Sequence, residues 1–334
     1  MKTYFVTGGE GFIGYHLCKE LLGHQDNYVV TYDAQKHYVP LVRSRWPFYQ
    51  VYRIRSLNSS NLVRIRGDTT DRGLLKERLE ICKPDIIIHL AALPIANVSN
   101  KYPEEARRNI LDGTITLLDV LREASFEFER FVYTSSSMVY GDFRRDEDGQ
   151  IIPAKEDQQC EPIGLYGAMK LSGEHITKAY SRRFGFPYTI IRPSAVYGPT
   201  DCNRRVTEIF LDRALKGEKL RLDNGGHHQL DFTYVQDLAK GFVLAIENDK
   251  AINETFNMTR GEGRSIRELA ETVAGLIPGT EMYEKDVDVY RPNRGALDIT
   301  KARDLLGYAP QYSLEAGMRE YVTFVTNVQE EMNW

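Results

Sequence analysis

The stretch Lys2-Thr-Tyr-Phe-Val-Thr-Gly-Gly-Glu-Gly-Phe-Ile-Gly14 organises the rest of this chain. Its apolar run, Tyr4 to Val6, is too short for a helix and is typical of a buried strand. Glycines follow at the spacing G-x-x-G-x-x-G, and a helical apolar pattern follows the glycines. Glycines let the backbone approach a pyrophosphate, and the first turn of a helix directs free N–H groups at it. The residues predicted to bind a dinucleotide here are Gly8, Gly11, Phe12, Ile13 and Gly14.

A glycine pattern by itself fits an ordinary strand–helix turn equally well, so its context decides the interpretation. A second apolar strand, Tyr28 to Tyr32, ends at Asp33, near the distance expected for an acid that binds the adenosine ribose. A carboxylate there accepts hydrogen bonds from both ribose hydroxyls and repels a 2′-phosphate. The sequence therefore predicts NAD rather than NADP as the cofactor.

The composition argues against several other classes of protein. With 334 residues and 42% hydrophobic content, the chain can bury a large core, in one large or two unequal domains. The net charge of −4 comes from both signs mixed along the chain, which argues against a nucleic-acid partner or an anionic membrane surface. No apolar run approaches the ~20 residues of a membrane span, and the first strand leaves no room for a signal peptide. The four cysteines have neither a C-x-x-C pair nor a metal-ligand spacing, so we expect reduced thiols, no metal site and a cytoplasmic protein.

Apolar strands alternate with helical patterns through much of the chain. Strands are expected at 62–65, 85–90, 130–134 and 188–192, and long helices at 103–123 and 166–184. This alternation, with continuously apolar strands, predicts an α/β fold with a Rossmann-type doubly wound parallel sheet. Residues 1–198 are expected to form mainly the NAD-binding domain, with part of 230–260 returning to it. Residues 199–334 are expected to form mainly a smaller, interleaved substrate lobe over the carboxyl edge of the sheet.

Three segments close to the predicted cofactor site need separate interpretation. Asp68 follows the third strand, where it either meets the adenine edge or caps the helix that begins near Asp71. Residues 35–61 are rich in arginines and aromatic side chains, and an elaborated loop with exposed arginines is favoured over a phosphate site. Ala91 and Ala92 follow the fourth strand, where small residues let a cofactor pass close over the sheet.

The segment Tyr166-Gly-Ala-Met-Lys170 carries the predicted chemistry. Its i, i+4 spacing places both side chains on one helix face. A tyrosine with a pKa of about 10 is a weak base at neutral pH, but a lysine ammonium and an oxidised nicotinamide nearby favour its phenolate. The serine cluster 135–137, at the end of a strand, is suited to hold a reacting hydroxyl. A Y-x-x-x-K pattern alone is usually a solvated helix face, but after a dinucleotide motif and a serine-rich strand end it predicts a catalytic base.

These motifs resemble those of the extended short-chain dehydrogenase/reductases, in the sugar-nucleotide epimerase/dehydratase branch. They span nearly the whole chain and are specific for the family, but much less so for the substrate. The matching positions are Thr7 to Gly14, Asp33, Gly67, Asp68, His89 to Ala92, Ser135 to Ser137, Val139 to Gly141, Tyr166, Lys170, Arg192, Pro193, Val196 to Pro199, Asp231, Phe232, Tyr234, Val235, Asp237, Arg291 and Pro292.

The resemblance implies a role for each matched position. Tyr166 resembles the family's catalytic base, Lys170 the residue that lowers its pKa and holds the nicotinamide ribose, and Ser136 the catalytic hydroxyl. The further cofactor-binding positions implied are Asp33, Asp68, Thr69, Leu90, Ala91, Ala92, Ser135, Pro193 and Val196, together with Tyr166 and Lys170 themselves. For a nucleotide-sugar substrate, the implied binding positions are Ser99, Ser136, Ser137, Met138, Tyr166, Arg204, Arg205 and Arg291. The resemblance also implies a homodimer built from the helices 103–123 and 166–184.

The residues after Ser136 distinguish the reactions of this family. Its dehydratases carry Asp-Glu there and its decarboxylating members a Glu, whereas this chain has Ser137 and Met138, which cannot do that acid–base work. By elimination the chain resembles a 4-epimerase, in which the C4 hydroxyl is oxidised to a ketone that is then reduced on its other face. The alternatives are a dehydrogenase, ketoreductase or 4,6-dehydratase of the same family, or a catalytically idle protein that binds the cofactor.

Three departures from the family pattern bear on substrate binding. Leu230 stands where the family usually has a diphosphate-binding arginine, and Ala195 where it usually has asparagine. Within 109–113, an asparagine and a glycine are one residue further apart than usual. Arg204 or Arg205 is a candidate to replace the missing arginine, and an ordinary surface arginine is the competing interpretation of either.

The interpretation of Asp33 is testable by substitution. Asp33→Ala is expected to weaken NAD binding by about tenfold or more, because the ribose hydroxyls lose a charged acceptor. An arginine added beside it is expected to admit NADP. Isothermal titration calorimetry with the two dinucleotides measures both effects, and equal affinities in the unaltered protein would contradict the prediction.

Overall fold

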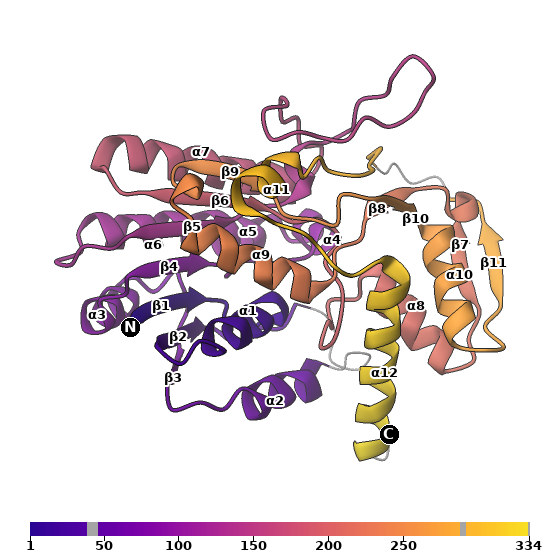
Figure 1. The fold of residues 1–334 in the computed structure, drawn as a ribbon, viewed down its shortest axis with the longest axis horizontal. Coiled ribbons are helices and arrows are strands. Elements are labelled where there is room, and N and C mark those ends of the chain that lie inside the picture. Colours follow the sequence, from indigo (N-terminus) through magenta and orange to yellow (C-terminus); the bar gives the residue numbers. More distant parts are fainter. Residues whose placement is uncertain (39–45, 288–291, 333–334) are drawn as a thin grey trace.

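The glycine-rich stretch leads out of a central strand of a seven-stranded sheet. The computed structural model describes residues 1–38, 46–287 and 292–332. The strands of this sheet are β1 (Lys2–Thr7), β2 (Asn27–Asp33), β3 (Leu62–Arg66), β4 (Ile86–His89), β5 (Arg130–Thr134), β6 (Tyr188–Arg192) and β9 (Glu254–Asn257). All neighbours are parallel, in the order β3-β2-β1-β4-β5-β6-β9 (Figure 1). The strand order reverses between β1 and β4, and sheets of this kind bind ligands outside the carboxyl ends of the strands at such a point.

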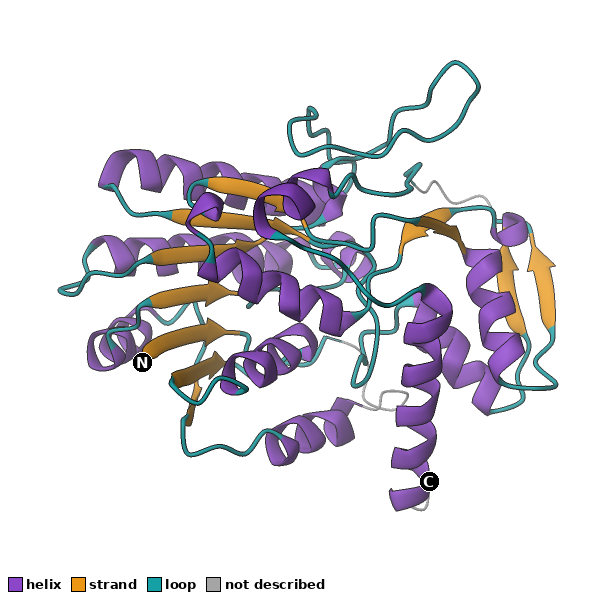
Figure 2. Cartoon of the chain, in the orientation of Figure 1, coloured by secondary structure: helices purple, strands orange, loops and turns teal. Residues whose placement is uncertain are grey.

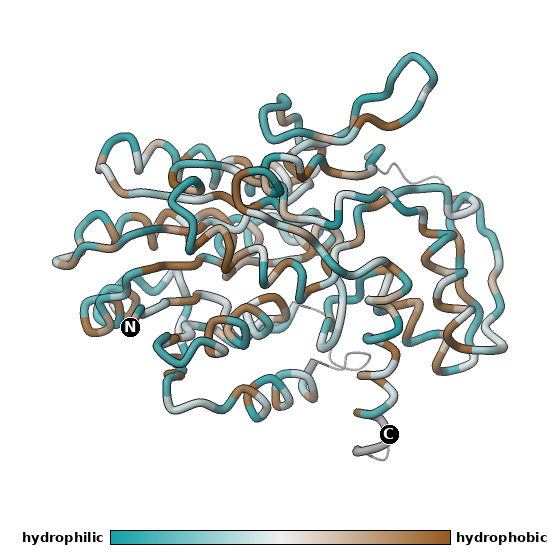
Figure 3. The backbone as a smooth tube through the Cα atoms, in the orientation of Figure 1, coloured by the Kyte–Doolittle hydropathy of each residue, from teal (hydrophilic) through white to brown (hydrophobic). Residues whose placement is uncertain are grey.

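Helices cover both faces of the sheet. One face is covered by α1 (Phe12–Leu22), α9 (Val235–Glu247) and α11 (Thr300–Leu306), the other by α3 (Arg72–Cys82), α6 (Gly113–Arg122) and α7 (Leu165–Phe184). Side chains alternate between the two faces along a strand. Tyr4 and Val6 belong to the core under α1 and α9, and Phe5 belongs to the core under α3, α6 and α7. Because both faces are buried, the central strands are largely apolar (Figure 3).

A smaller lobe has a hydrophobic core of its own. Its helices are α8 (Val206–Leu215), α10 (Ile266–Leu276) and α12 (Leu314–Met332). Its strands pair as β8 (Gln229–Asp231) with β10 (Gly263–Ser265), antiparallel, and β7 (Leu220–Asp223) with β11 (Met282–Lys285), parallel (Figure 2). Between β8 and β10 the chain returns to the large sheet as α9 and β9, so the two parts are interleaved. The Rossmann-type α/β fold is confirmed, and the domain boundary after residue 198 stays a prediction.

An irregular helix carries the extra residue of the segment 109–113. After α4 (Ala96–Lys101), the chain forms α5 (Pro103–Ala106), the π-helix η2 (Arg107–Asp112) and then α6. A π-helix has wider turns than an α-helix and accommodates an inserted residue. Where η2 ends, a Cβ on Gly113 would lie 2.5 Å from Thr69 Oγ1, so a glycine is needed for this close approach. The remaining short turns are η3 (Ser137–Val139), η4 (Asn224–Gly226) and η5 (Asp249–Ala251).

Helix α2 (Trp46–Ser56) corrects the expectation for residues 35–61. A loop with exposed arginines was expected there, but the segment contains a helix. On this helix Arg53 is only 4% exposed, whereas Arg55 is exposed as expected. Arg43 and Arg45 lie outside the described residues. Tyr52 of α2 lies edge-on to Phe324 of α12, with ring centroids 5.2 Å apart. The helix α12, which contacts the aromatic side chains of α2, is therefore far away in the sequence. The sequence of the segment itself gives no indication of this contact.

None of the helices within 1–38, 46–287 and 292–332 is long and apolar enough to cross a membrane. The four cysteines, Cys18, Cys82, Cys160 and Cys202, are free thiols.

The homodimer through α6 and α7 remains a prediction. Large apolar side chains are exposed at both ends of α7, with Leu165 41% and Phe184 45% exposed, and exposed apolar surface of this kind favours association. Sedimentation equilibrium at micromolar concentration is expected to give the mass of two chains. A monomer under these conditions would contradict the prediction.

Candidate active site

A cavity of about 990 Å³ lies at the carboxyl ends of the strands, between the sheet and the smaller lobe. The predicted cofactor residues line it: Gly8, Gly11, Phe12, Ile13, Gly14, Asp33, Asp68, Thr69, Leu90, Ala91, Ala92, Ser135, Tyr166, Lys170, Pro193 and Val196. Leu230 and Phe232 line it from the smaller lobe. Its volume is at the upper end of the ~300–1,000 Å³ usual for ligand sites, which suits two ligands bound side by side.

The glycine loop forms the phosphate end of this cavity. Gly8 has a φ of +72°, and a Cβ there would lie 2.8 Å from Ala91 N. A Cβ on Gly14 would collide with Gly8 O, so α1 begins directly against the loop. Gly11 is the N-cap of α1 and brings no side chain to cap it, which leaves N–H groups of the first turn available to an anion. The loop therefore fits the pyrophosphate of a dinucleotide.

Asp33 is held at the end of β2 by the loop itself. Its carboxylate accepts N–H hydrogen bonds from Glu10 at 3.0 Å and from Gln35 at 2.7 Å. Burial raises the pKa of Asp33, while these hydrogen bonds and the nearby Arg53 oppose the rise. The hydrogen bonds orient the carboxylate on the cavity wall, as ribose binding requires.

Asp68 faces the cavity and does not cap α3. The N-cap of α3 is Asp71, whose side chain accepts the N–H of Leu74 at 3.1 Å. Asp68 instead forms an ion pair with Lys36 (Nζ–Oδ2 2.7 Å), and this interaction, together with hydrogen bonds from Thr70, outweighs burial and lowers the pKa of Asp68. The geometry thus favours the first of the two interpretations of this residue.

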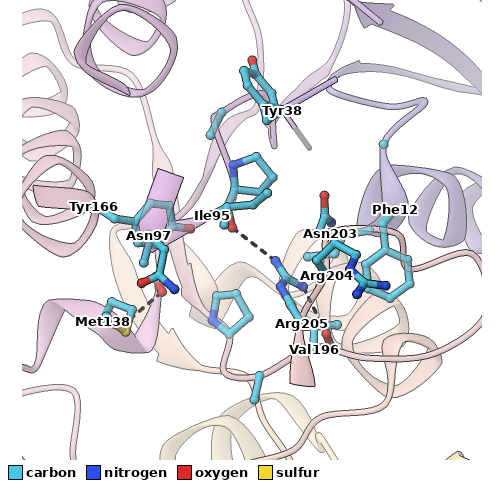
Figure 4. A pocket seen from close by; sticks show the side chains of 18 of the residues that line it. Phe12, Tyr38, Ile95, Asn97, Met138, Tyr166, Val196, Asn203, Arg204 and Arg205 are labelled. Carbon is cyan, nitrogen blue, oxygen red and sulfur yellow. Dashed lines mark hydrogen bonds between the residues drawn. The ribbon is translucent and has the colours of Figure 1, made fainter. Parts of the chain in front are cut away.

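Tyr166 lies in the first turn of α7 and faces the cavity (Figure 4). Burial raises the pKa of its phenol. The positive charge of Arg205, a hydrogen bond with Ser136, and the positive charge of Arg294 each lower this pKa. Ser136 is the N-cap of η3, and its Oγ also accepts the N–H of Met138 at 3.2 Å. The hydroxyls of Tyr166 and Ser136 therefore meet at one place on the cavity wall.

Lys170 lies one turn further along α7 and is 4% exposed. Its Nζ donates to Thr134 O at 2.8 Å and lies 5.3 Å from the centre of the Tyr133 ring. Burial lowers the pKa of Lys170 to about 7, and Glu174 partly opposes this. The positive charges with the clearest effect on Tyr166 are those of the two arginines, whereas the sequence pointed to Lys170 and the oxidised nicotinamide.

A buried ion pair holds α7 on the sheet. Glu174 of α7, 1% exposed, accepts two hydrogen bonds from Arg192 of β6, from Nε at 2.8 Å and from Nη2 at 2.7 Å. The hydroxyl of Ser135 donates to the same carboxylate. Ser135 thus supports α7, while its neighbour Ser136 presents its hydroxyl to Tyr166.

The predicted substrate residues do not all reach the cavity. Those that line it are Ser136, Ser137, Met138, Tyr166, Arg204 and Arg205. Ser99 is fully buried and donates to Ile95 O at 3.0 Å, and among the described residues it is Ala96, Asn97 and Asn100 of α4 that line the cavity instead. This corrects the placement of Ser99, because residues two apart on a helix face different sides. Arg291 lies outside the described residues.

Arg204 and Arg205 have different surroundings. Arg204 forms an ion pair with Asp212 (Nη1–Oδ2 3.3 Å). Arg205 donates to Val196 O at 3.1 Å and to Pro94 O at 3.4 Å (Figure 4), and no carboxylate of the described chain lies at ion-pair distance from it. Arg205 therefore brings an unpaired positive charge into the cavity.

Arg294 is a residue of the site that the sequence analysis missed. It donates to the hydroxyls of Ser137 and Ser194, and its Nη1 lies 3.4 Å from Met138 Sδ. The nearest sequence signal was the Arg291-Pro292 pair, which drew attention to a neighbouring arginine. Arg294 itself lies in a loop, where no periodicity indicates the direction of a side chain.

Together these parts define a dinucleotide-dependent enzyme with a serine, a tyrosine and a lysine beside the cofactor site. Residues 4–259 match the NAD dependent epimerase/dehydratase family. The chain belongs to this family, and its cofactor is NAD.

Similar proteins act on nucleotide sugars. A putative UDP-glucose 4-epimerase of Methanocaldococcus jannaschii is 30% identical over 336 residues, which cover 96% of this chain and 98% of that protein. The UDP-glucuronic acid 4-epimerase of Bacillus cereus, solved with UDP-glucuronic acid and NAD, has a TM-score of 0.88 at 28% identity, covering 98% of this chain and 99% of the other. The UDP-glucose 4-epimerase of Thermotoga maritima, solved with UDP-glucose, has a TM-score of 0.85 at 26% identity and the same coverage.

Tyr166→Phe tests the role of the phenol. The change removes the ionisable oxygen and keeps the ring, so NAD affinity and melting temperature are expected to change little. Turnover is expected to fall by about 10²–10⁴-fold, the contribution of a positioned general base. Steady-state kinetics on a converted nucleotide sugar measure the loss, and near-normal turnover would show that the proton takes another route.

Lys170→Met tests which charge sustains the phenolate. The role predicted for Tyr166 makes the phenolate the active form, so activity is expected to be lost as the pH falls below the pKa of Tyr166. Removing the ammonium raises that pKa, so the acid limb of the pH–rate profile is expected to move to higher pH, with weaker NAD retention. An unmoved acid limb would assign the effect to the two arginines.

Proposed function

We propose that this protein is a 4-epimerase of a nucleotide sugar, which oxidises C4 to a ketone and reduces it again on the opposite face. One observation carries the proposal. The hydroxyls of Tyr166 and Ser136 meet in the cavity beside the dinucleotide loop, while Ser137 and Met138 occupy the positions at which a dehydratase needs carboxylates. The UDP-sugar enzymes among the similar proteins support the same reaction and make a UDP-linked sugar the first substrate to test.

The side chains of the site divide the work of proton transfer and orientation. Tyr166, as the phenolate, takes the proton of the C4 hydroxyl in the first half of the reaction and returns it in the second. Ser136 hydrogen-bonds the same substrate oxygen and holds it within reach of Tyr166. Lys170 stabilises the phenolate and binds the nicotinamide ribose. NAD, when bound, supplies the hydride acceptor for the first half and the hydride donor for the second.

Arg205 is the side chain we assign to the diphosphate. Leu230 carries no charge and so leaves that role unfilled, and Arg205 faces the same cavity, where among the described residues its guanidinium donates to the backbone oxygens of Val196 and Pro94. A guanidinium without a carboxylate partner is well suited to a phosphate oxygen.

Product analysis without added NAD tests the reaction. The protein, loaded with NAD and freed of excess cofactor, is incubated with UDP-glucose and separately with UDP-glucuronic acid. Proton NMR is expected to show at least one of them converted to a mixture of its two C4 epimers, over many turnovers per chain. The Tyr166→Phe protein, treated in the same way, is the matched control.

Other products would contradict this function in recognisable ways. A 4-keto product in an amount limited by the NAD present would indicate a net dehydrogenase. A 4-keto-6-deoxy product would indicate a dehydratase.

A further inference from the structure

Arg294 is a charged group in the cavity that the proposed reaction leaves without a role. Its Nη2 donates to Ser194 Oγ at 2.9 Å and to Ser137 Oγ, and the Ser137 hydroxyl in turn donates to Ser194 at 3.1 Å. The two serines are 2% and 3% exposed. Their hydroxyls and the guanidinium form a fixed polar cluster on the cavity wall, beside Met138.

No opposite charge of the described chain pairs with Arg294. Its Nε is buried and has no hydrogen-bond acceptor. Asp231 attracts the guanidinium from a distance, but its carboxylate already accepts from Leu297 N at 2.9 Å and Thr259 Oγ1 at 2.8 Å. Burial lowers the pKa of Arg294 to about 10, so the group is charged at neutral pH. A buried, unpaired cation costs free energy, and a bound anion offsets that cost.

The position of Arg294 indicates which negatively charged group of a nucleotide sugar would contact it. It contacts Ser137, the neighbour of Ser136, and its charge acts on Tyr166, so it lies where C4 reacts. In a hexopyranose, C4 is bonded to C5, which carries C6, whereas C1 and its diphosphate lie across the ring. An anion next to the C4 hydroxyl is therefore a carboxylate at C6.

We propose that Arg294, with Ser137 and Ser194, binds a C6 carboxylate, so that the substrate class is a nucleotide-linked hexuronic acid. This inference rests on the proposed 4-epimerase function, because that function places C4 at Tyr166. The planar guanidinium suits a carboxylate, since its N–H groups match both oxygens. The serine hydroxyls, now bonded to Arg294 and to each other, are the further donors.

Binding measurements on the NAD-loaded full chain test the carboxylate site. Calorimetry with UDP-glucuronic acid, UDP-glucose and UDP separates the contribution of the carboxylate from that of the nucleotide. The unaltered protein is expected to bind UDP-glucuronic acid about 10–100-fold more tightly than UDP-glucose, the effect of hydrogen bonds to a charged group. Arg294→Met is expected to abolish this preference. Its affinities for UDP and for UDP-glucose are expected to stay within about twofold of those of the unaltered protein.

Two further variants sharpen the comparison. Arg294→Lys keeps the charge without the planar fork, and it is expected to retain part of the preference. Arg260→Met is the matched control, because Arg260 donates to Pro310 O at 2.6 Å and is not among the described residues that line the cavity. It is expected to keep the full preference. Should Arg294→Met not fold, Arg294→Gln, which retains N–H donors for the serines, replaces it.

Two results would overturn the carboxylate site. One is equal or tighter binding of UDP-glucose by the unaltered protein. The other is an Arg294→Met protein that loses affinity for UDP as strongly as for UDP-glucuronic acid, which would place Arg294 at the diphosphate. C4 epimerisation of UDP-glucose alongside either result would leave the proposed function standing. A carboxylate preference that depends on Arg294, without C4 epimerisation of either sugar, would instead overturn the proposed function.

Discussion

The ion pair between Glu174 and Arg192 fixes the geometry on which the site depends. Both side chains are almost completely buried, and their contact has two hydrogen bonds, so it has a single favourable arrangement. Breaking such a pair by removing one partner costs about 3–5 kcal/mol, because the other charge stays buried. Glu174 lies about two helical turns after Tyr166. The pair therefore sets how far α7 reaches along the sheet, and with it the distance from Tyr166 to the serines after β5.

Positive charge is distributed along the cavity in several chemically different forms. The first turn of α1 offers N–H groups at the pyrophosphate end, and Lys170 offers an ammonium with a lowered pKa beneath the reacting position. Arg205 and Arg294 offer guanidinium groups at separate places on the wall. The chain as a whole carries a net charge of −4, so the overall charge gives no indication of the local potential. This distribution offers a long polyanionic ligand a series of separate contacts.

The features that the sequence predicted are those with local signals. The glycine loop, the apolar strands and the pair Tyr166–Lys170 each depend on residues a few positions apart, and their spacing reflects the geometry of a turn, a strand or a helix. Arg294 has no such signal, since its contacts with Ser137 and Ser194 span 157 and 100 residues. The same reason explains α2, which packs on α12, and the buried side chain of Arg53, which donates to Thr200 O. The orientation of Ser99 was missed for a different reason. A sequence pattern can locate a helix along the chain without showing which of its sides faces the cavity.

The π-helix η2 accommodates an extra residue before the regular helix α6 begins. Six residues, Arg107–Asp112, contain the extra position, and regular α-helical structure resumes at Gly113. The residues of α6 that pack on the sheet, among them Leu117 and Leu121, are buried in the core. An insertion in a regular helix would rotate every later side chain by about 100°. Here the π-helix takes up this rotation within one wide turn. The cavity wall beside Thr69 and the hydrophobic core under α6 can therefore change independently of each other.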